Sequence, residues 1–246
     1  MDSIQKKLLE EVAGLHEVPQ GAYSLRINGS LQGKNSSENI EIVQKTDKPG
    51  IDIYIKPGTK NESLHIPVIL SQSGLRELVY NDFHVGEDCD VTIVAGCGIH
   101  NGGSEASEHS GVHSFFVGKN ATLVVHEKIM THGKQVADTE FEVELNGENS
   151  GTHVVSRAVA RDSSKQKFLS KITGNNKCSG HTECDAIIMD DATVAAIPEI
   201  LAVNPDASLI HEAAIGKIAG EQLIKLMTLG LSEKEAEEEI VNGFLR

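Results

Sequence analysis

A turn followed by a short strand recurs through the middle of this chain. The clearest copies begin at Gly86, Gly118 and Gly147, and each passes through Asp or Asn at its third position into a strand rich in β-branched residues. The copies follow one another at nearly constant spacing, and a shorter echo relates Asp191 to Asp206 at about half of it. Such repetition is typical of a solenoid, in which each coil buries a face of the next. We therefore predict a mainly β fold with a parallel β-helix core; the alternative is a β-sandwich, which also produces imperfect repeats.

Helical periodicity is confined to the two ends of the chain. Near the start, Ser3 is a candidate N-cap and Gly14 a candidate C-terminal stop. The apolar face between them consists of Ile4, Leu8, Leu9 and Val12. Short strands are predicted from residue 23 onwards, the first at 23–27, 40–43 and 51–55. We expect an N-terminal helical segment at 1–20 and a β-helix core at 21–212.

The helical period returns after Gly216, so residues 213–246 are predicted to form two helices. The apolar face of the first, which Gly230 ends, consists of Ala219, Leu223, Leu226 and Met227. The second begins with Ser232 and Glu235 in capping-box positions, and its apolar stripe consists of Ala236, Ile240 and Phe244. These stripes either pack on the end of the β-region or form a docking element for a partner.

Composition narrows the classes of function. The formal net charge of -14 over 246 residues disfavours nucleic acid and anionic membranes as partners. The charged N-terminal segment does not resemble a signal peptide, and no apolar run is long enough to span a membrane. Four cysteines are too few for a disulfide framework, so we expect free thiols or metal ligands in a cytoplasmic protein. Nucleotide-binding and hydrolase motifs are missing, so an ATP-driven step would need a partner.

One candidate site lies near the C-terminus. Cys184 and the pair His211 and Glu212 provide a thiol, an imidazole and a carboxylate within one short stretch of the chain. This combination suits transition metals of borderline softness. The alternatives are a small buried thiol and an internal His–Glu hydrogen bond. Cys178, His181 and Cys184 also form a C-x2-H-x2-C run, which either assists transfer or is a solvent-facing loop.

A second candidate site is the segment 97–113, which contains Cys97, His100, His109 and His113. Cys97 and His100 have C-x2-H spacing, and the two later histidines would share a face of a helix. The glycines at 98, 102, 103 and 111 argue against such a helix. A polar, Gly-rich loop between strands is therefore favoured, and the alternative is a metalloenzyme with zinc or iron bound here.

The C-terminal sequence resembles a known family. The resemblance lies in the segments 184–189, 204–207, 211–213, 216–218, 221–223, 230–236 and 240–244. They are similar to the C-terminal core of the SufB/SufD proteins, the scaffold subunits of the Suf machinery that assembles iron–sulfur clusters. The resemblance covers residue 184 to the C-terminus, extends more loosely back to about residue 85, and is weak before that. The short chain is most similar to minimal, SufD-like scaffolds of archaea and anaerobic bacteria.

The resemblance implies a right-handed parallel β-helix whose copies pair through their C-terminal strands. It also implies that Cys184 receives sulfur and holds a nascent, transient iron–sulfur cluster, with His211 and Glu212 as further ligands. Because one chain carries all of these groups, a homodimeric, non-enzymatic scaffold is expected. The implied partners are a SufC-like ABC ATPase and recipient apo iron–sulfur proteins. The residues expected to bind the ATPase are Glu221, Leu223, Leu226, Met227, Ser232 and Phe244.

Overall fold

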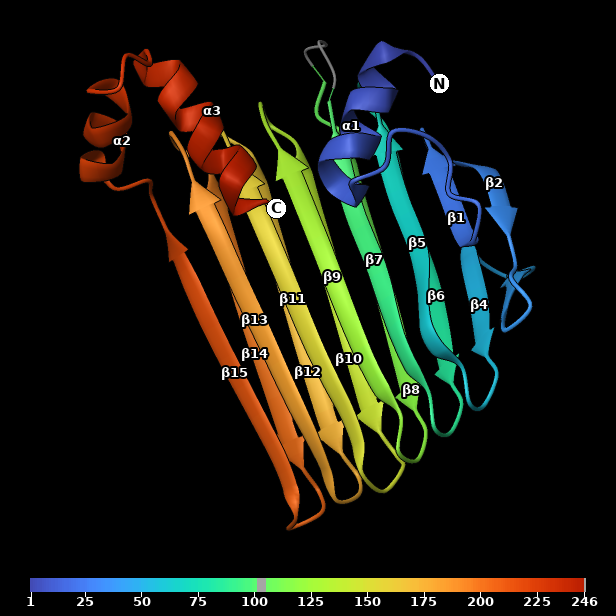
Figure 1. Ribbon diagram of the computed structural model, residues 1–246. Helices are drawn as coiled ribbons and strands as arrows, with labels where there is room; N and C mark the ends of the chain where they lie inside the picture. The colour runs from blue at the N-terminus through green and yellow to red at the C-terminus, as the bar shows by residue number, and fades with distance from the viewer. Residues whose placement is uncertain (101–104, 246) are drawn as a thin grey trace.

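The structure is a computed structural model that describes residues 1–100 and 105–245. The described residues form a short N-terminal helix, a long series of strands and two C-terminal helices (Figure 1). In chain order they are α1 (Ser3–Ala13), β1 (Ala22–Ile27), β2 (Ser30–Asn35), β3 (Ile40–Gln44), β4 (Gly50–Ile55), β5 (Lys60–Leu70), β6 (Arg76–Val85), β7 (Asp90–Ile99), β8 (Glu108–Val117), β9 (Thr122–Thr131), β10 (Val136–Leu145), β11 (Ser150–Ala160), β12 (Lys165–Gly174), β13 (Cys178–Ile188), β14 (Thr193–Ala202), β15 (Ala207–Gly216), α2 (Gly220–Met227) and α3 (Glu233–Phe244).

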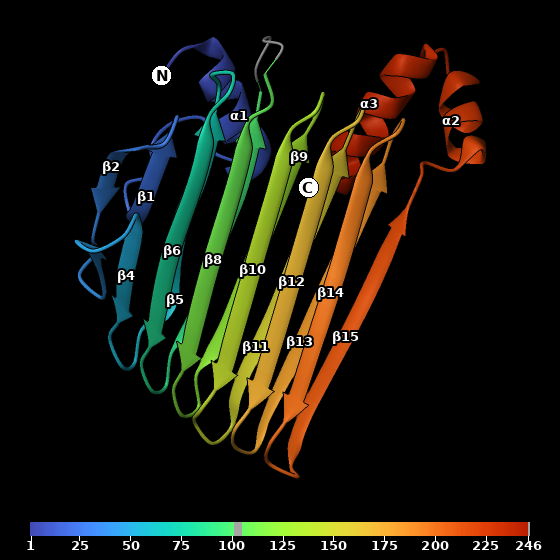
Figure 2. The same ribbon diagram turned by 180° about the vertical axis from the view of Figure 1, so that it is seen from behind.

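From β4 onwards, consecutive strands alternate between two sheets. One sheet has the order β15-β13-β11-β9-β7-β5-β1-β2 and the other the order β14-β12-β10-β8-β6-β4-β3. Each strand from β6 to β13 pairs in parallel with the strands two before and two after it in the sequence. The chain thus winds as a parallel β-solenoid of about 6 turns, which Figures 1 and 2 show from opposite sides. The predicted β-helix is confirmed, and the β-sandwich alternative is wrong.

The repeated turns stack on one another at one edge of the solenoid. Asp88, Asn120 and Asn149 all have positive φ, which Asn and Asp adopt more easily than other residues with side chains. The side-chain amide of Asn120 donates from Nδ2 to Asp88 Oδ1 at 3.0 Å, and the side-chain amide of Asn149 donates from Nδ2 to Asn120 Oδ1 at 3.3 Å. A Cβ on Gly147 would lie 2.0 Å from the backbone nitrogen of Lys119, so only glycine permits this spacing of the coils.

The shorter repeat near the C-terminus has a different origin. Asp191 lies in the turn before β14, and Asp206 lies in the turn before β15. These two strands are consecutive and belong to opposite sheets. The separation between the two aspartates therefore corresponds to half a coil, whereas that between the glycine turns corresponds to a whole one.

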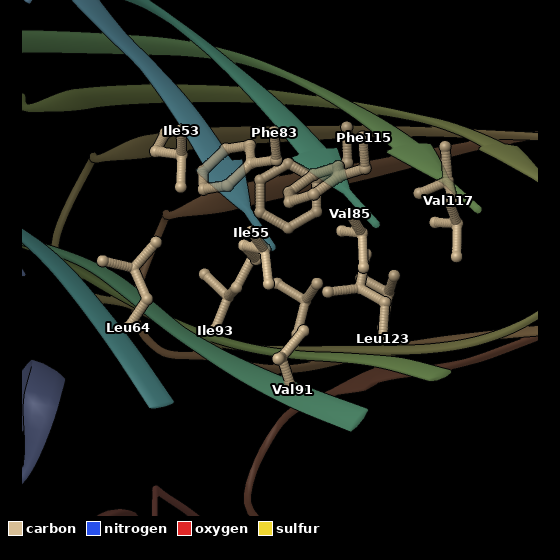
Figure 3. Packing of buried hydrophobic residues seen from close by; sticks show 14 of the residues in the cluster. Ile53, Ile55, Leu64, Phe83, Val85, Val91, Ile93, Phe115, Val117 and Leu123 are labelled. Carbon is tan, nitrogen blue, oxygen red and sulfur yellow. The ribbon is translucent and has the colours of Figure 1, made fainter. Parts of the chain in front are cut away.

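The space between the two sheets is filled mainly by apolar side chains, which alternate with outward-facing residues. Figure 3 shows branched aliphatic residues meeting the rings of Phe83 and Phe115. These two rings stack at 4.5 Å between centroids, and Phe141 continues the series from Phe115 at 5.5 Å. Stacking in register along the axis is the way in which successive coils bury one another.

The strand pairing differs between the two ends of the solenoid. At the N-terminal end, β2 and β3 pair antiparallel with β1 and β4 and interrupt the parallel stacking. At the C-terminal end, both sheets stop at parallel strands, β14 and β15. Ile200 continues the register row of buried Ile172, yet 45% of its surface is exposed, because no described strand follows it. The interior of the solenoid is therefore open at its C-terminal end.

Two helices, α1 and α3, cover part of the outer face of the eight-stranded sheet. α1 packs on it through Leu8, Leu9 and Val12, whereas Ile4, predicted on the same face, is exposed. The N-cap is Asp2, not Ser3, because the Asp2 carboxylate accepts from the Gln5 amide at 2.8 Å. Gly14 ends the helix as predicted. No helix among the described residues has the length and apolar character needed to cross a membrane.

The two C-terminal helices differ in how far they pack on the solenoid. α3 begins at Ser232 with the predicted capping box, and Val241 and Leu245 pack against Val159 of β11. α2 buries none of its residues, and it ends at Met227, before Gly230. β15 continues to Gly216, beyond the predicted boundary at residue 212, and that division of the chain into domains stays a prediction.

Candidate metal centre

The three predicted ligands lie on the last strands of the eight-stranded sheet, at the open end. Cys184 is buried on β13 and faces the solenoid interior. His211 on β15 faces the same side, since it alternates with Leu209, which packs against the core. Cys184 pairs with Ala213 and Thr182 with His211, so the thiol and the imidazole are diagonal neighbours. Glu212 faces the opposite side of the sheet, because successive residues of a strand alternate.

The thiol of Cys184 is held in its protonated form within this chain. Burial, together with the charges of Glu127 and Asp185, raises its pKa to about 12. The nearest register neighbour on β11 is Ser156, whose hydroxyl donates to Glu127 at 2.7 Å. Because metals bind the thiolate, an ion at Cys184 must displace a proton and the site must be opened to the ion.

His211 is suited to bind a cation in its neutral form. Burial, and next the charge of His181, lower its pKa. Its Nδ1 atom is buried and has no hydrogen-bond partner among the described residues. A buried imidazole nitrogen without a partner carries a desolvation cost that a metal ion would remove.

Glu212 contacts a different group of residues. Its side chain is 67% exposed and lies 3.6 Å from the Nε2 atom of His181 on the outer face. The isolated chain therefore places two of the predicted ligands inside the solenoid and one outside. All three lie beside the same unpaired edge, that of β15.

The C-x2-H-x2-C run is part of a strand and not a solvent-facing loop. Cys178, His181 and Cys184 all belong to β13, where both cysteines face inward and His181 faces outward. A spacing of three positions in a strand places side chains on opposite faces, so the run does not converge on one ion. All four cysteines of the chain are buried and none forms a disulfide.

The segment 97–113 does not bring its predicted ligands together, and residues 101–104 of it lie outside the described residues. Cys97 faces inward on β7, in the first sheet, whereas His109 and His113 face inward on β8, in the second. The favoured loop is also wrong for 108–113, which is strand. The pKa of His113 is lowered to about 3 by burial and by the charge of His109. His100 is exposed and points towards His132, with 3.0 Å between their ring nitrogens.

A different set of ligands converges on the outer face of the first sheet. Within the described part of the chain, the group of histidine and acidic side chains close enough to share an ion is His153, His181 and Glu183, whose ligand atoms lie within 4.8 Å of one another. The sequence reasoning missed His153 and Glu183. The signal was available in the repeat, because His153 and His181 lie one coil apart and pair in register.

The fold and these side chains define a class: a parallel β-solenoid with an open C-terminal end, a buried thiol and a half-buried imidazole beside that end, and a helical tail. Residues 105–244 match the family described as "SUF system FeS cluster assembly, SufBD core domain". The match covers more than half of the chain. The chain belongs to the SufBD family, as its sequence motifs indicated.

Curated relatives agree with this assignment. An iron–sulfur cluster assembly SufBD family protein of Methanothermobacter thermautotrophicus is 35% identical over 134 residues, which are 54% of this chain and 33% of the relative. One from Methanocaldococcus jannaschii is 33% identical over 184 residues, covering 68% of this chain and 57% of the relative. The iron–sulfur cluster assembly protein SufB of Bacillus subtilis is 37% identical over 101 residues, 39% of this chain and 22% of the relative. The chain thus spans between about a fifth and three fifths of these relatives.

Proposed function

We propose that this protein is a non-enzymatic scaffold on which an iron–sulfur cluster is assembled and from which it is passed to recipient apo proteins. The observation that carries the proposal is the placement of Cys184 and His211 at the open end of a SufBD-family solenoid. The cluster is cargo of the scaffold, held for a time and then released.

The ligand chemistry supports a transient cargo. The thiolate of Cys184 is the soft ligand that iron in a cluster prefers. His211 and Glu212 are harder ligands, and a mixed set holds a cluster less firmly than four thiolates. Because β15 is the last strand of its sheet, a cluster placed at its edge can take Cys184 and His211 from the inner side and Glu212 from the outer side.

A homodimer at this edge is part of the proposal. Parallel strands that end without a partner offer unpaired backbone groups for another chain. Apolar side chains on and next to these strands are exposed, namely Ile197, Ile200, Leu201, Val203, Ile210 and Ile215. A second copy would cover them and place two sets of ligands at one interface.

A SufC-like ABC ATPase is the proposed energy source, and the helical tail its dock. Ile224 lies on α2 and is 62% exposed, and Leu229 lies just after α2 and is 76% exposed. Exposed apolar residues of this kind are typical of a surface that binds another protein. Phe244 is less suited, because it packs on the sheet and its carbonyl accepts from Arg157 at 3.0 Å. A shape change driven by the ATPase would also give iron and sulfide access to the buried Cys184 thiol.

The test is anaerobic reconstitution with ferrous iron and sulfide after co-expression with the candidate ATPase. Cys184→Ser replaces the thiolate with a hydroxyl that stays protonated at neutral pH, so most sulfur-to-iron charge-transfer absorption should be lost. His211→Ala and Glu212→Ala should lower cluster content in smaller steps, since solvent or sulfide can replace a harder ligand.

His100→Ala is the matched control, because its imidazole is exposed and belongs to the other predicted ligand set. It should leave the spectrum unchanged. Normal iron and sulfide in the Cys184 variant, with loss in the His100 variant, would move the site to the segment 97–113 and support the metalloenzyme alternative.

A further inference from the structure

His153, His181 and Glu183 form a cluster on the outer face of the eight-stranded sheet, separate from Cys184. His153 lies on β11, and His181 and Glu183 lie at alternate positions of β13, so all three face the same side. The imidazole rings stack at 5.0 Å between centroids with 8° between their planes. Glu183 Oε1 is 3.3 Å from Nε2 of His153 and 4.0 Å from Nε2 of His181.

These separations match those around a single ion. Metal–nitrogen and metal–oxygen bonds of about 2.0–2.2 Å place neighbouring ligand atoms roughly 3.0–3.5 Å apart. The distance from His153 to Glu183, which is also that of a hydrogen bond between them, lies in that range, and all three ligand atoms lie within 4.8 Å of one another. Two imidazoles and one carboxylate are the donor set of many mononuclear Fe(II) sites, and they also suit Zn(II).

An independent observation concerns His181. Its Nε2 atom is buried and makes no hydrogen bond to the described residues, although it points into the cluster. Glu212 Oε2 on β15 is 3.6 Å from the same nitrogen, so a further carboxylate is available as a fourth ligand. A buried nitrogen between two carboxylates, without a hydrogen bond of its own, is satisfied by a bound cation.

The cluster is also reachable from solvent. His153 and Glu183 line a pocket of about 440 Å³ on the outer face, together with His126, Val155 and Arg157. Two cations also line this pocket, Lys128 and Arg157, and the Arg157 side chain donates to the backbone carbonyl of Phe244 at 3.0 Å. An ion can therefore enter without any opening of the solenoid.

We propose that His153, His181 and Glu183 bind one divalent first-row transition-metal ion, of the Fe(II) or Zn(II) class, on the outer face of the sheet. The site uses nitrogen and oxygen donors only, and the sheet separates it from the Cys184 thiol. It rests on the geometry of these residues and does not depend on the proposed scaffold function.

The test is a titration of the full chain, without a polyhistidine tag, with cobalt(II) chloride. Cobalt(II) bound by nitrogen and oxygen gives weak d–d absorption, whereas a thiolate ligand adds an intense charge-transfer band, so the spectrum identifies the donors. The variants are His153→Ala, His181→Ala, Glu183→Gln and Cys184→Ser. His65→Ala is the matched control. His65 lies on the same outer face and in the same register row as Glu183, but on the distant strand β5.

The wild type, the Cys184 variant and the His65 variant should each bind one equivalent of cobalt without a thiolate band. Loss of His153, His181 or Glu183 should weaken binding at least about tenfold, since even partners outside the ligand shell contribute roughly 10-fold to 100-fold. Circular dichroism checks that each variant is folded. A thiolate band that disappears with Cys184, affinity indifferent to the two histidines, or no cobalt binding by the wild type would each overturn the proposal.

The cobalt titration and the test of the scaffold function give separate results. Cluster reconstitution is followed by sulfur-to-iron absorption that depends on Cys184, whereas the cobalt site is followed in the absence of sulfide and persists in Cys184→Ser. Failure of one measurement therefore leaves the other interpretable.

Discussion

Glu127 and Cys184 show how a solenoid interior changes the chemistry of single residues. Both face inward, on β9 and β13, with Ser156 of β11 between them in register. Burial raises the pKa of Glu127 to about 7, although hydrogen bonds from Ser156 and Thr139 oppose the change. The ionised form of Glu127 in turn helps to raise the pKa of the Cys184 thiol. The carboxylate and the thiol therefore titrate as neighbours and not as isolated groups.

The raised pKa of Glu127 predicts a pH-dependent stability. Because the folded state holds this proton up to about pH 7 and the unfolded chain loses it near 4.5, stability should fall as pH rises between these values and then level off. The effect is at most about 3 kcal/mol. Glu127→Gln, which cannot ionise, should raise the urea midpoint relative to wild type at pH 8 and much less at pH 5.

Glu140→Gln is the control for this measurement, because Glu140 faces outward on β10. Its effect on the urea midpoint should be small at both pH values. An equal gain from Glu127→Gln at pH 5 and pH 8 would show that burial of the charged form is not what limits stability.

At the scale of elements, the two C-terminal helices have opposite environments. α3 is held to the sheet by Val241 and Leu245, so its removal would uncover Val159 and neighbouring apolar residues. α2, in contrast, buries none of its own residues. The docking prediction is therefore better tested by changing α2 alone than by deleting both helices.

Leu226→Glu should abolish co-purification with the ATPase, because a charge on the apolar face of α2 opposes its burial in an interface. Circular dichroism of the variant should be unchanged, since α2 buries no residues in the isolated chain. The matched control is Ile4→Glu, which places the same charge on an exposed apolar residue of α1. If the Leu226 variant still retains the ATPase, the dock lies elsewhere on the chain.

At the scale of the whole molecule, the asymmetry of the solenoid's ends is the main feature. Antiparallel strands close the N-terminal end, whereas β14 and β15 leave unpaired edges and exposed apolar residues at the other. Edges of this kind promote either a defined pairing or aggregation. A closed pair of copies satisfies the edge without further growth.

Light scattering at micromolar concentration should therefore give the mass of a dimer. Ile210→Lys should shift the mass towards monomer, because it places a charge on the exposed apolar edge strand. Tyr54→Lys, an exposed residue on β4 near the closed end, should leave the dimer intact. A stable wild-type monomer would contradict the pairing, and long filaments would indicate end-to-end assembly of the solenoid instead of a closed dimer.

The sequence alone determined the features that local chemistry controls. Gly, Asn and Asp at recurring positions defined the turns, and the distance between them gave the length of a coil, because only these residues readily adopt the required backbone. The capping box at Ser232 was also predicted from local chemistry, because Ser and a Glu three positions later can each bond the backbone N–H of the other. The N-cap of the first helix lies one position earlier than predicted, because Asp2 forms a capping box with Gln5 three positions later.

The tertiary structure decided which residues meet. Cys184 and His211 face inward while Glu212 faces outward, and His109 and His113 are buried in the opposite sheet from Cys97. The stacking of His153 on His181 depends on the register between β11 and β13. A sequence motif gives only the spacing of residues along the chain. In a solenoid, which residues lie close together depends on the face of the strand and on the register between coils. Both are fixed only when the coils pack on one another.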